Sequence, residues 1–356
     1  MKVNMAPKYS VVIPTLNRSR KLCHALDSVL NQRVDGDLEI VVVDNCSEDD
    51  TQQVLAEPRY SQVRVIRQPV RVPQIPNFMT AFRAATGDYI SILYDDEEML
   101  GENLLRKGRV LDEHPEVVAV TSSVILRNSE GELSPGVVIR PKFTIETRFE
   151  YLKNTFQKTT GGLPPFLIRR SAVERLELDP RDEPLIDNAY VLRLSALGAI
   201  ATMPEGFITD TASDAETIRN SDAEMMRNGM LEAIEDPQSP KKLIPLPGIW
   251  FYWCQFRLRV DHLIATNDSF TRRQVQILYR LARINYRQGI WKAAFHRLMI
   301  TKKLRPALRL LARAGAMDLS LLIPPVWFFI RWKLTDTSAP IADSKPAEQR
   351  RELATY

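Results

Sequence analysis

The chain has 356 residues, of which 44% are hydrophobic and 26% are charged, and its formal net charge is +4. This composition excludes a disordered or fibrous chain, because it provides enough apolar surface for a substantial core. The three scattered cysteines, Cys23, Cys46 and Cys254, exclude a disulfide scaffold and lack the spacing of a zinc site, so they favour a reducing cytoplasm.

Neither end of the sequence shows a signal for export or membrane insertion. The first ten residues lack the apolar core of a secretory signal. The most apolar late stretch, Leu319–Ile330, is too short to cross a bilayer and is interrupted by Pro324 and Pro325. We therefore expect a cytoplasmic protein that does not span a membrane.

Short apolar runs alternate with helical segments through the first hundred residues. Strands are predicted at Tyr9–Ile13, Leu38–Val43, Val63–Arg67 and Tyr89–Leu93, and helices at Arg20–Asn31, Thr51–Leu55 and Asn77–Thr86. Alternation of this kind predicts an α/β fold with a mostly parallel central sheet and flanking helices. Ligands of such sheets bind outside the carboxyl ends of the strands.

Polar residues follow three of these predicted strands. They are Pro14–Arg18, Asp44-Asn45, and the acidic run Asp95 to Glu98. Carboxylates gathered at the mouth of a parallel sheet suit a hard divalent cation, because Mg²⁺ and Mn²⁺ take oxygen ligands and share them with substrate phosphates. The alternative is a solvated helix start, in which Glu97 and Glu98 complement the helix dipole.

Several common catalytic motifs are missing from the sequence. Pro-Thr-Leu-Asn follows the first strand where a dinucleotide-binding domain would carry GxGxxG. The sequence also contains no P-loop, no GxSxG elbow and no HExxH. Its four histidines show no metal-binding spacing, so imidazole chemistry is not expected.

Three segments together resemble the nucleotide-sugar-binding half of GT-A glycosyltransferases of family 2. They are VVIPTLNR, EIVVVDNCSEDDT and ATGDYISILYDDEEML, and their order and spacing match as a set. The resemblance extends to about residue 210, through IRRSAVERL and IDNAYVLRLSALGAI. It implies the three-layer GT-A fold. This chain departs from the common Asp-x-Asp pattern, because Tyr94 stands where the first Asp often falls.

The resemblance also implies roles for particular residues in binding the donor. Asp96 would ligate Mn²⁺ or Mg²⁺, and Asp95 would face the ribose or a metal-bound water. Thr15 and Asp44 would hold the base and ribose, with Pro14, Asn17, Arg18 and Asn45 completing the donor site. The structural alternative makes Thr15 a turn residue and Asp44 a helix cap.

A candidate catalytic base lies in the second half of the resembling region. Val117–Arg127 and Phe166–Ile168 are predicted strands, with a further short strand near Gly136–Ile139 and a Gly/Pro-rich loop at Thr159–Pro165 that would border the acceptor. Asp187 opens a helical run, Asn188–Leu197, and stands six residues before Arg193. This spacing resembles the family's EDxxLxxR-like pattern, with Ile186 in place of the usual acid. We predict Asp187 as the base and take Asp182 and Glu183 as the alternatives.

The carboxyl-terminal third is predicted to be helical and basic. Between Thr271 and Lys333 there are fourteen Lys and Arg against one acid, Asp318, so this segment carries +13 and the remainder −9. The predicted organisation is a GT-A domain at 1–211, a polar Pro-rich connection at 212–248, a basic helical extension at 249–334 and a disordered tail at 335–356.

The sequence therefore predicts a metal-dependent, inverting glycosyltransferase of the hexosyltransferase type. It would move a sugar from a nucleoside diphosphate donor, with UDP favoured, to an acceptor hydroxyl in bacterial cell-surface polysaccharide or glycolipid synthesis. The acceptor could be lipid-linked, and the basic extension could hold the enzyme peripherally at the anionic inner face of a membrane. The alternative is that the apolar residues of the extension pack on the catalytic domain as an ordinary core helix. No nucleic acid is expected as a partner. Two alternatives are a catalytically silent nucleotide-binding scaffold and a metal-dependent nucleotidyltransferase.

Overall fold

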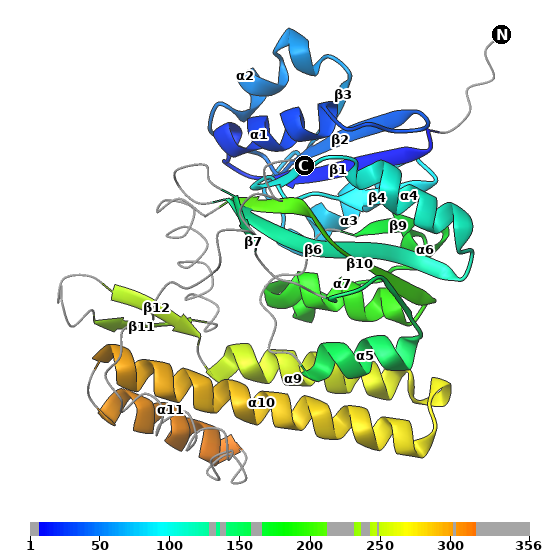
Figure 1. Ribbon diagram of the computed structural model, residues 1–356. Coiled ribbons are helices and arrows are strands. Elements are labelled where there is room, and N and C mark those ends of the chain that lie inside the picture. The colour runs from blue at the N-terminus through cyan, green and yellow to red at the C-terminus, as the bar shows by residue number, and fades with distance from the viewer. Residues whose placement is uncertain are drawn as a thin grey trace, which may run out of the picture. The chain divides into compact units, whose positions relative to one another are not determined.

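The computed structural model describes residues 7–127, 133–135, 140–157, 166–211, 231–235, 243–247, 249–301 and 304–317 (Figure 1). The chain divides into two compact units. The first consists of Met1–Asn228 and Trp253–Asn285, and the second of Gly229–Tyr252 and Tyr286–Tyr356. The predicted boundaries at 211, 248 and 334 fall in or beside residues outside the described ranges, so they stay predictions.

Among the described residues, ten strands form one mixed sheet in the first unit. Its strands are β1 Tyr9–Thr15, β2 Leu38–Asp44, β3 Val63–Arg67, β4 Tyr89–Ile92, β5 Glu97–Met99, β6 Val117–Arg127, β7 Leu133–Pro135, β8 Thr144–Glu146, β9 Leu167–Arg169 and β10 Ala199–Thr211. The order is β3-β2-β1-β4-β9-β6-β10-β5, with β7 paired to β6 and β8 to β10. Strands β3, β2, β1 and β4 are parallel, as are β6 and β10.

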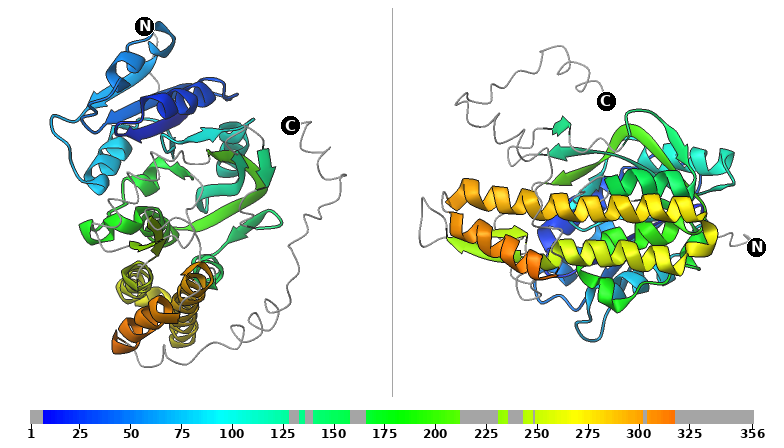
Figure 2. Two further views of the ribbon diagram at one scale, coloured as in Figure 1. Left: turned by 90° about the vertical axis from the view of Figure 1, so that its left-hand side faces the viewer. Right: turned by 90° about the horizontal axis from the view of Figure 1, so that it is seen from below.

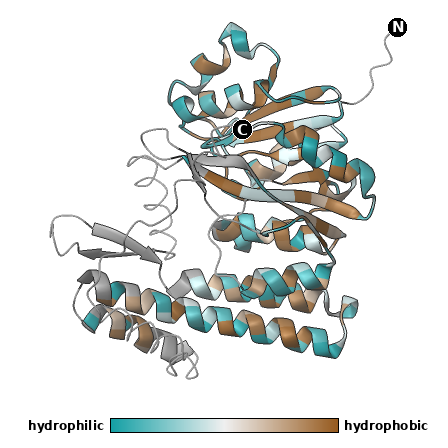
Figure 3. Cartoon of the chain, in the orientation of Figure 1, coloured by the Kyte–Doolittle hydropathy of each residue, from teal (hydrophilic) through white to brown (hydrophobic). Residues whose placement is uncertain are grey.

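Helices cover both faces of this sheet. They are α1 Ser19–Leu30, α2 Thr51–Leu55, α3 Gln74–Ala84, α4 Asn103–Glu113, α5 Arg148–Gln157, α6 Arg170–Val173 and α7 Ile186–Ser195. One hydrophobic core joins α1 and α4 to one face of the sheet, and a second joins α3 and α7 to the other. Hydrophobic residues concentrate on the strands between them (Figure 3). This confirms the predicted three-layer α/β fold.

The turn before β4 places two backbones in close contact. A Cβ atom on Gly87 would lie 2.6 Å from Ser10 Oγ and 2.7 Å from Ser10 N, so only glycine fits there. The Gly87 N–H donates to Ser10 Oγ at 2.7 Å. This contact sets the start of β4 beside β1 and, through their parallel register, brings their carboxyl ends to the same edge.

Most predicted elements lie within a few residues of the observed ones, but several observed elements were not predicted. Glu97 and Glu98 were considered as a possible helix start, whereas they belong to β5, which pairs antiparallel with β10. Helices α4 and α5 and the long strand β10 were also missed. The strand predicted near Gly136–Ile139, the loop at Thr159–Pro165 and the predicted disordered tail lie outside the described residues.

The remaining described elements are helical, apart from one small sheet. The helices are α9 Ile249–Ala265, α10 Arg272–Thr301 and α11 Leu304–Met317, as predicted for the extension. In the second unit, β11 Leu231–Glu235 pairs antiparallel with β12 Leu243–Pro247, where the sequence predicted only a connection. The right view of Figure 2 shows the parts of α9 and α10 that belong to the first unit, residues 253–265 and 272–285, as neighbouring helices. Within the first unit, Arg259 on α9 donates to Asn285 Oδ1 on α10 at 2.7 Å.

Candidate active site

Three neighbouring strands end in polar residues that lie in one row. Thr15 on β1 pairs in register with Asp44 on β2, and Asp44 pairs with Arg67 on β3. Asp44 is completely buried, and its carboxylate accepts hydrogen bonds from Arg67 Nη1 and Gln52 Nε2, each at 2.7 Å, and from the Ser47 N–H at 2.9 Å. The carboxyl edge of the sheet therefore carries a buried carboxylate held by a half-exposed arginine.

The loops that follow β1 and β2 are linked to each other. Asn17 has a φ of 53°, a left-handed conformation that Asn tolerates better than most residues. Its N–H donates to Ser47 Oγ at 2.9 Å, and its side-chain oxygen accepts the Glu48 N–H at 2.8 Å. Asn45 bonds both the N–H and the carbonyl of Val72 at 2.9 Å. These side chains fix the loop that presents Arg18.

The two aspartates after β4 differ in their surroundings. Asp95 is 4% exposed, and it accepts from Thr15 Oγ1 at 2.7 Å and from Arg18 Nη1 at 2.7 Å. The Asp96 side chain is 21% exposed and lies 3.3 Å from the same Arg18 nitrogen. Burial raises the pKa of Asp95, and the negative charge of Asp96 also raises it. The positive charge of Arg18 and the hydrogen bonds from Thr15 and Arg18 lower it. Asp96 is thus the more accessible of the two carboxylates.

Asp187 lies beside these acids although it is ninety residues away in sequence. The Tyr94 hydroxyl donates a hydrogen bond to Asp187 Oδ1 at the start of α7. Burial raises the pKa of Asp187, the hydrogen bond from Tyr94 lowers it, and the negative charge of Asp96 raises it. A carboxylate with a raised pKa close to a second acidic group is the environment expected of a general base.

The two alternative bases have structural partners. Asp182 is 3% exposed and accepts from Arg193 at 2.9 Å and from Arg257 on α9 at 3.1 Å. Glu183 accepts a hydrogen bond from the backbone N–H of Gln74, the first residue of α3. Both acids therefore hold helices in place, which leaves Asp187 as the strongest candidate for the base.

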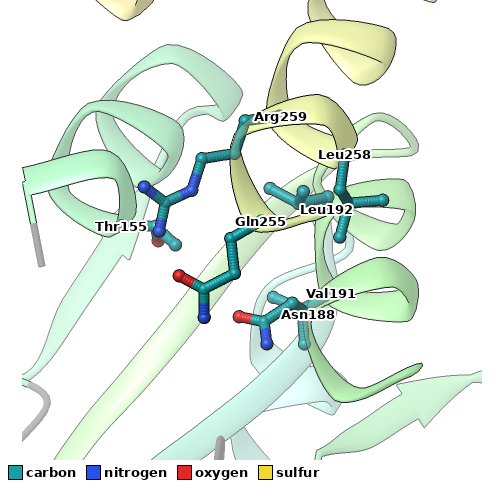
Figure 4. A pocket seen from close by; sticks show the side chains of 7 residues that line it. All are labelled: Thr155, Asn188, Val191, Leu192, Gln255, Leu258 and Arg259. Atoms are coloured by element: carbon teal, nitrogen blue, oxygen red, sulfur yellow. The ribbon is translucent and has the colours of Figure 1, made fainter. Parts of the chain in front are cut away.

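A small cavity lies behind the helix that carries Asp187. Its volume is about 10 Å³, and Figure 4 shows the side chains around it, which come from α5, α7 and α9: Thr155, Asn188, Val191, Leu192, Gln255, Leu258 and Arg259. That volume holds one water at most and is far too small for a nucleotide sugar. The cavity belongs to the packing that supports α7, and not to the donor site.

Comparison with known proteins identifies the domain that carries this geometry. Residues 10–176 match the profile of glycosyl transferase family 2. They form a family 2 glycosyltransferase domain. The match includes Thr15, Asp44, Asp95 and Asp96, and it ends before Asp187.

Curated relatives of this glycosyltransferase domain match over limited lengths. A "GalNAc(5)-diNAcBac-PP-undecaprenol beta-1,3-glucosyltransferase" of Campylobacter jejuni is 35% identical over 97 residues, which are 26% of this chain and 31% of that protein. A "PGL/p-HBAD biosynthesis glycosyltransferase" of Mycobacterium bovis is 29% identical over 127 residues, 35% of this chain and 49% of that one. The chain thus spans about a third of the first relative's length and about half of the second's.

Solved structures share the fold over a longer span. S. aureus TarS 1–349 in complex with UDP-GlcNAc has a TM-score of 0.55 at 16% identity, covering 81% of this chain and 80% of that one. The same TarS fragment in complex with UDP has a TM-score of 0.50 at 19% identity and covers 95% of each chain. At these identities the likeness shows the GT-A fold alone.

The glycosyltransferase domain offers a partial set of metal ligands. Within the described ranges, no three His, Cys, Asp or Glu side chains gather to hold an ion by themselves. Two adjacent carboxylates do share one cation, the Arg18 guanidinium, at the position where the sequence predicts the metal. A Mg²⁺ or Mn²⁺ ion commonly uses one or two protein carboxylates together with substrate phosphates. Asp96, with the adjacent Asp95, therefore suits a divalent cation.

The structure brings most predicted site residues to one edge of the glycosyltransferase domain. Thr15, Arg18, Asp95, Asp96 and Asp187 form one connected cluster, and Asp44 continues it along the strand row. Pro14 lies in β1 opposite Val43, and Asn17 and Asn45 fix the loops.

Two residues of the site were missed by the sequence analysis. Arg67 could have been found, because it is the last residue of a predicted strand beside the one that ends at Asp44. Tyr94 was noted only as a departure from the family motif. Its contact with Asp187 has no signal in the sequence, since the two residues are far apart along the chain.

Proposed function

We propose that this chain is an inverting glycosyltransferase that moves a sugar from a nucleoside diphosphate sugar to an acceptor hydroxyl. The observation that carries the proposal is the contact of Asp187 with Tyr94, which places it beside the Asp95–Asp96 pair and Arg18 of the family 2 domain. The candidate donor site and the candidate base thus lie next to each other. A nucleotidyltransferase is disfavoured by the family match, and a silent scaffold by the presence of Asp44, Asp95, Asp96 and Asp187 together.

Each part of the cluster has a role in this reaction. Bound at Asp96, Mn²⁺ or Mg²⁺ would neutralise the charge that develops on the departing nucleoside diphosphate. Thr15 fixes the orientation of Asp95, and Asp44 with Arg67 lies at the end of the row, where we place the base and ribose. Asp187 takes the proton of the attacking hydroxyl, and Tyr94 holds its carboxylate toward the acids.

The donor and acceptor classes follow from relatives. The TarS structure contains UDP-GlcNAc, which supports a UDP-sugar as donor here. The names of the Campylobacter and Mycobacterium relatives support a role in bacterial glycan or glycolipid synthesis with a lipid-linked acceptor.

A panel of UDP-, GDP- and dTDP-sugars with and without Mn²⁺, scored by melting temperature and by slow sugar release, tests this function. A ligand that binds the folded state at a hundred times its Kd stabilises it by about 2.7 kcal/mol, so a true donor is visible as a higher Tm. We expect a UDP-sugar to raise the Tm only with metal, and to be hydrolysed slowly. Binding without any turnover, even with candidate acceptors, would favour the scaffold alternative.

We also propose that the enzyme works in the cytoplasm, at the anionic inner face of a membrane. In the described part of the chain, no helix is long and apolar enough to cross a bilayer. The segment that motivates contact, between Leu321 and Lys333, lies outside the described residues but combines aromatic, aliphatic and basic residues in sequence.

Vesicle flotation tests this membrane contact. We expect the full chain to float with anionic vesicles at low salt and not with neutral ones, because each Lys or Arg near the surface contributes about 1 kcal/mol on anionic lipid. The double variant Trp327→Ser/Trp332→Ser should bind weakly. If the two proteins floated equally, or if the full chain did not float at all, the proposed membrane contact through this segment would be wrong.

A further inference from the structure

Arg18 joins the two carboxylates at which the metal is expected. Its Nη1 lies 2.7 Å from Asp95 Oδ1 and 3.3 Å from Asp96 Oδ2. The same guanidinium nitrogen thus lies near both carboxylates. A divalent cation bound at Asp96 would compete with this guanidinium for the carboxylates.

The position of Arg18 allows its side chain to leave this contact. The side chain is 31% exposed, against 5% for Asp95, so it reaches the carboxylates from the solvent side. Arg18 directly precedes α1, and its side chain makes no capping bond to that helix. Its carbonyl accepts the Leu22 N–H at 2.9 Å, a backbone contact that does not depend on the side chain. The side chain of Arg18 is therefore not needed to cap α1.

The Arg18 guanidinium would face different charges as the ligands arrive. A divalent cation bound at Asp96 would bring a second positive charge close to the guanidinium, so the arginine and the metal would repel each other in the free protein. A diphosphate brings at least two negative charges, and both cations are then needed. Arg18 consequently opposes metal binding before the nucleotide arrives and supports nucleotide binding afterwards.

We propose that Arg18 exchanges partners during donor binding, from Asp95 and Asp96 in the metal-free protein to the donor diphosphate once a divalent cation takes the carboxylates. Arg18 is then a positioning residue whose guanidinium stays paired with Asp95 and Asp96 until metal and nucleotide bind together. This inference rests on the proposed donor site, but it concerns binding alone and does not require sugar transfer.

The substitution Arg18→Gln separates this role from a structural one, because the two binding steps should change in opposite directions. We expect the variant to bind Mn²⁺ alone at least about fivefold more tightly than the wild type, measured by electron paramagnetic resonance of free Mn²⁺. With saturating Mn²⁺, its affinity for UDP, measured by calorimetry, should be at least about fivefold weaker. A damaged fold would weaken both.

Two matched variants complete the experiment. Arg33→Gln removes an arginine whose side chain is 78% exposed and paired with Glu102, and it should change neither affinity. Asp96→Asn should weaken Mn²⁺ binding and so locate the ion. Unchanged or weaker Mn²⁺ binding by Arg18→Gln would overturn the proposal, as would unchanged UDP binding. Since the Mn²⁺ measurement uses neither nucleotide nor acceptor, a failed transfer assay would count against the proposed function and not against this exchange.

Discussion

Asp187→Asn is expected to reduce sugar transfer by about 10²–10⁴-fold, the usual contribution of a general base. The change is nearly isosteric and keeps an oxygen that can accept the Tyr94 hydroxyl, so α7 should stay in place. Donor affinity should remain within about twofold, because a base acts on the acceptor and not on the nucleotide.

The rate should be measured well above the pH at which ordinary carboxylates titrate. Burial raises the pKa of Asp187, so the wild-type rate should fall on the acid side at a higher pH than for an exposed aspartate. The base is active only when its carboxylate is deprotonated, so the rate should fall as the pH is lowered through its pKa. In the Asn variant, this acid-side decrease of the rate should be absent.

Asp182→Asn is the matched control for this prediction. Its carboxylate is paired with Arg193 and Arg257, so its removal should lower the Tm and leave the chemical step near its wild-type rate at temperatures where the variant is folded. If Asp187→Asn kept more than about a tenth of the rate, the base would have to be sought elsewhere, beginning with Glu183.

The parts of the fold predicted correctly are those specified by local pattern. β1, β2 and β4 are buried on both faces and therefore appear as continuous apolar runs, and the polar residues after them mark their ends. Parallel pairing then places Thr15, Asp44 and Asp95 at one edge without any knowledge of tertiary contacts. The donor side of the candidate site could thus be predicted from the sequence.

Some of the parts that were missed depend on partners distant in sequence. Glu97 and Glu98 are poor strand formers, and β5 exists because β10 pairs with it and Arg127 forms an ion pair with Glu98. The sequence likewise does not indicate that Asp182 forms ion pairs with two arginines. The choice among the three candidate bases therefore needed the structure.

Asp96→Ala is expected to abolish the metal-dependent part of UDP binding and to lower transfer by at least about 10²-fold, because the leaving diphosphate loses its counter-charge. Asp96 is the more exposed of the pair, so the variant should fold with a Tm close to the wild type. Asp95→Asn provides the contrast, since Asp95 is buried between Thr15 and Arg18 and its substitution should lower the Tm as well.

Titration with UDP in the presence of Mn²⁺ and in the presence of excess chelator measures the effect of Asp96→Ala directly. The wild type should bind UDP more tightly with Mn²⁺, whereas the variant should bind it equally weakly in both conditions, because the contacts that we propose for Thr15, Asp44, Arg67 and Arg18 do not depend on a metal at Asp96. Wild-type activity that persisted in excess chelator would show that Arg18 alone supplies the positive charge at the two aspartates. The metal assignment of Asp96 would then be wrong, even though the carboxylates and the fold around them are in place.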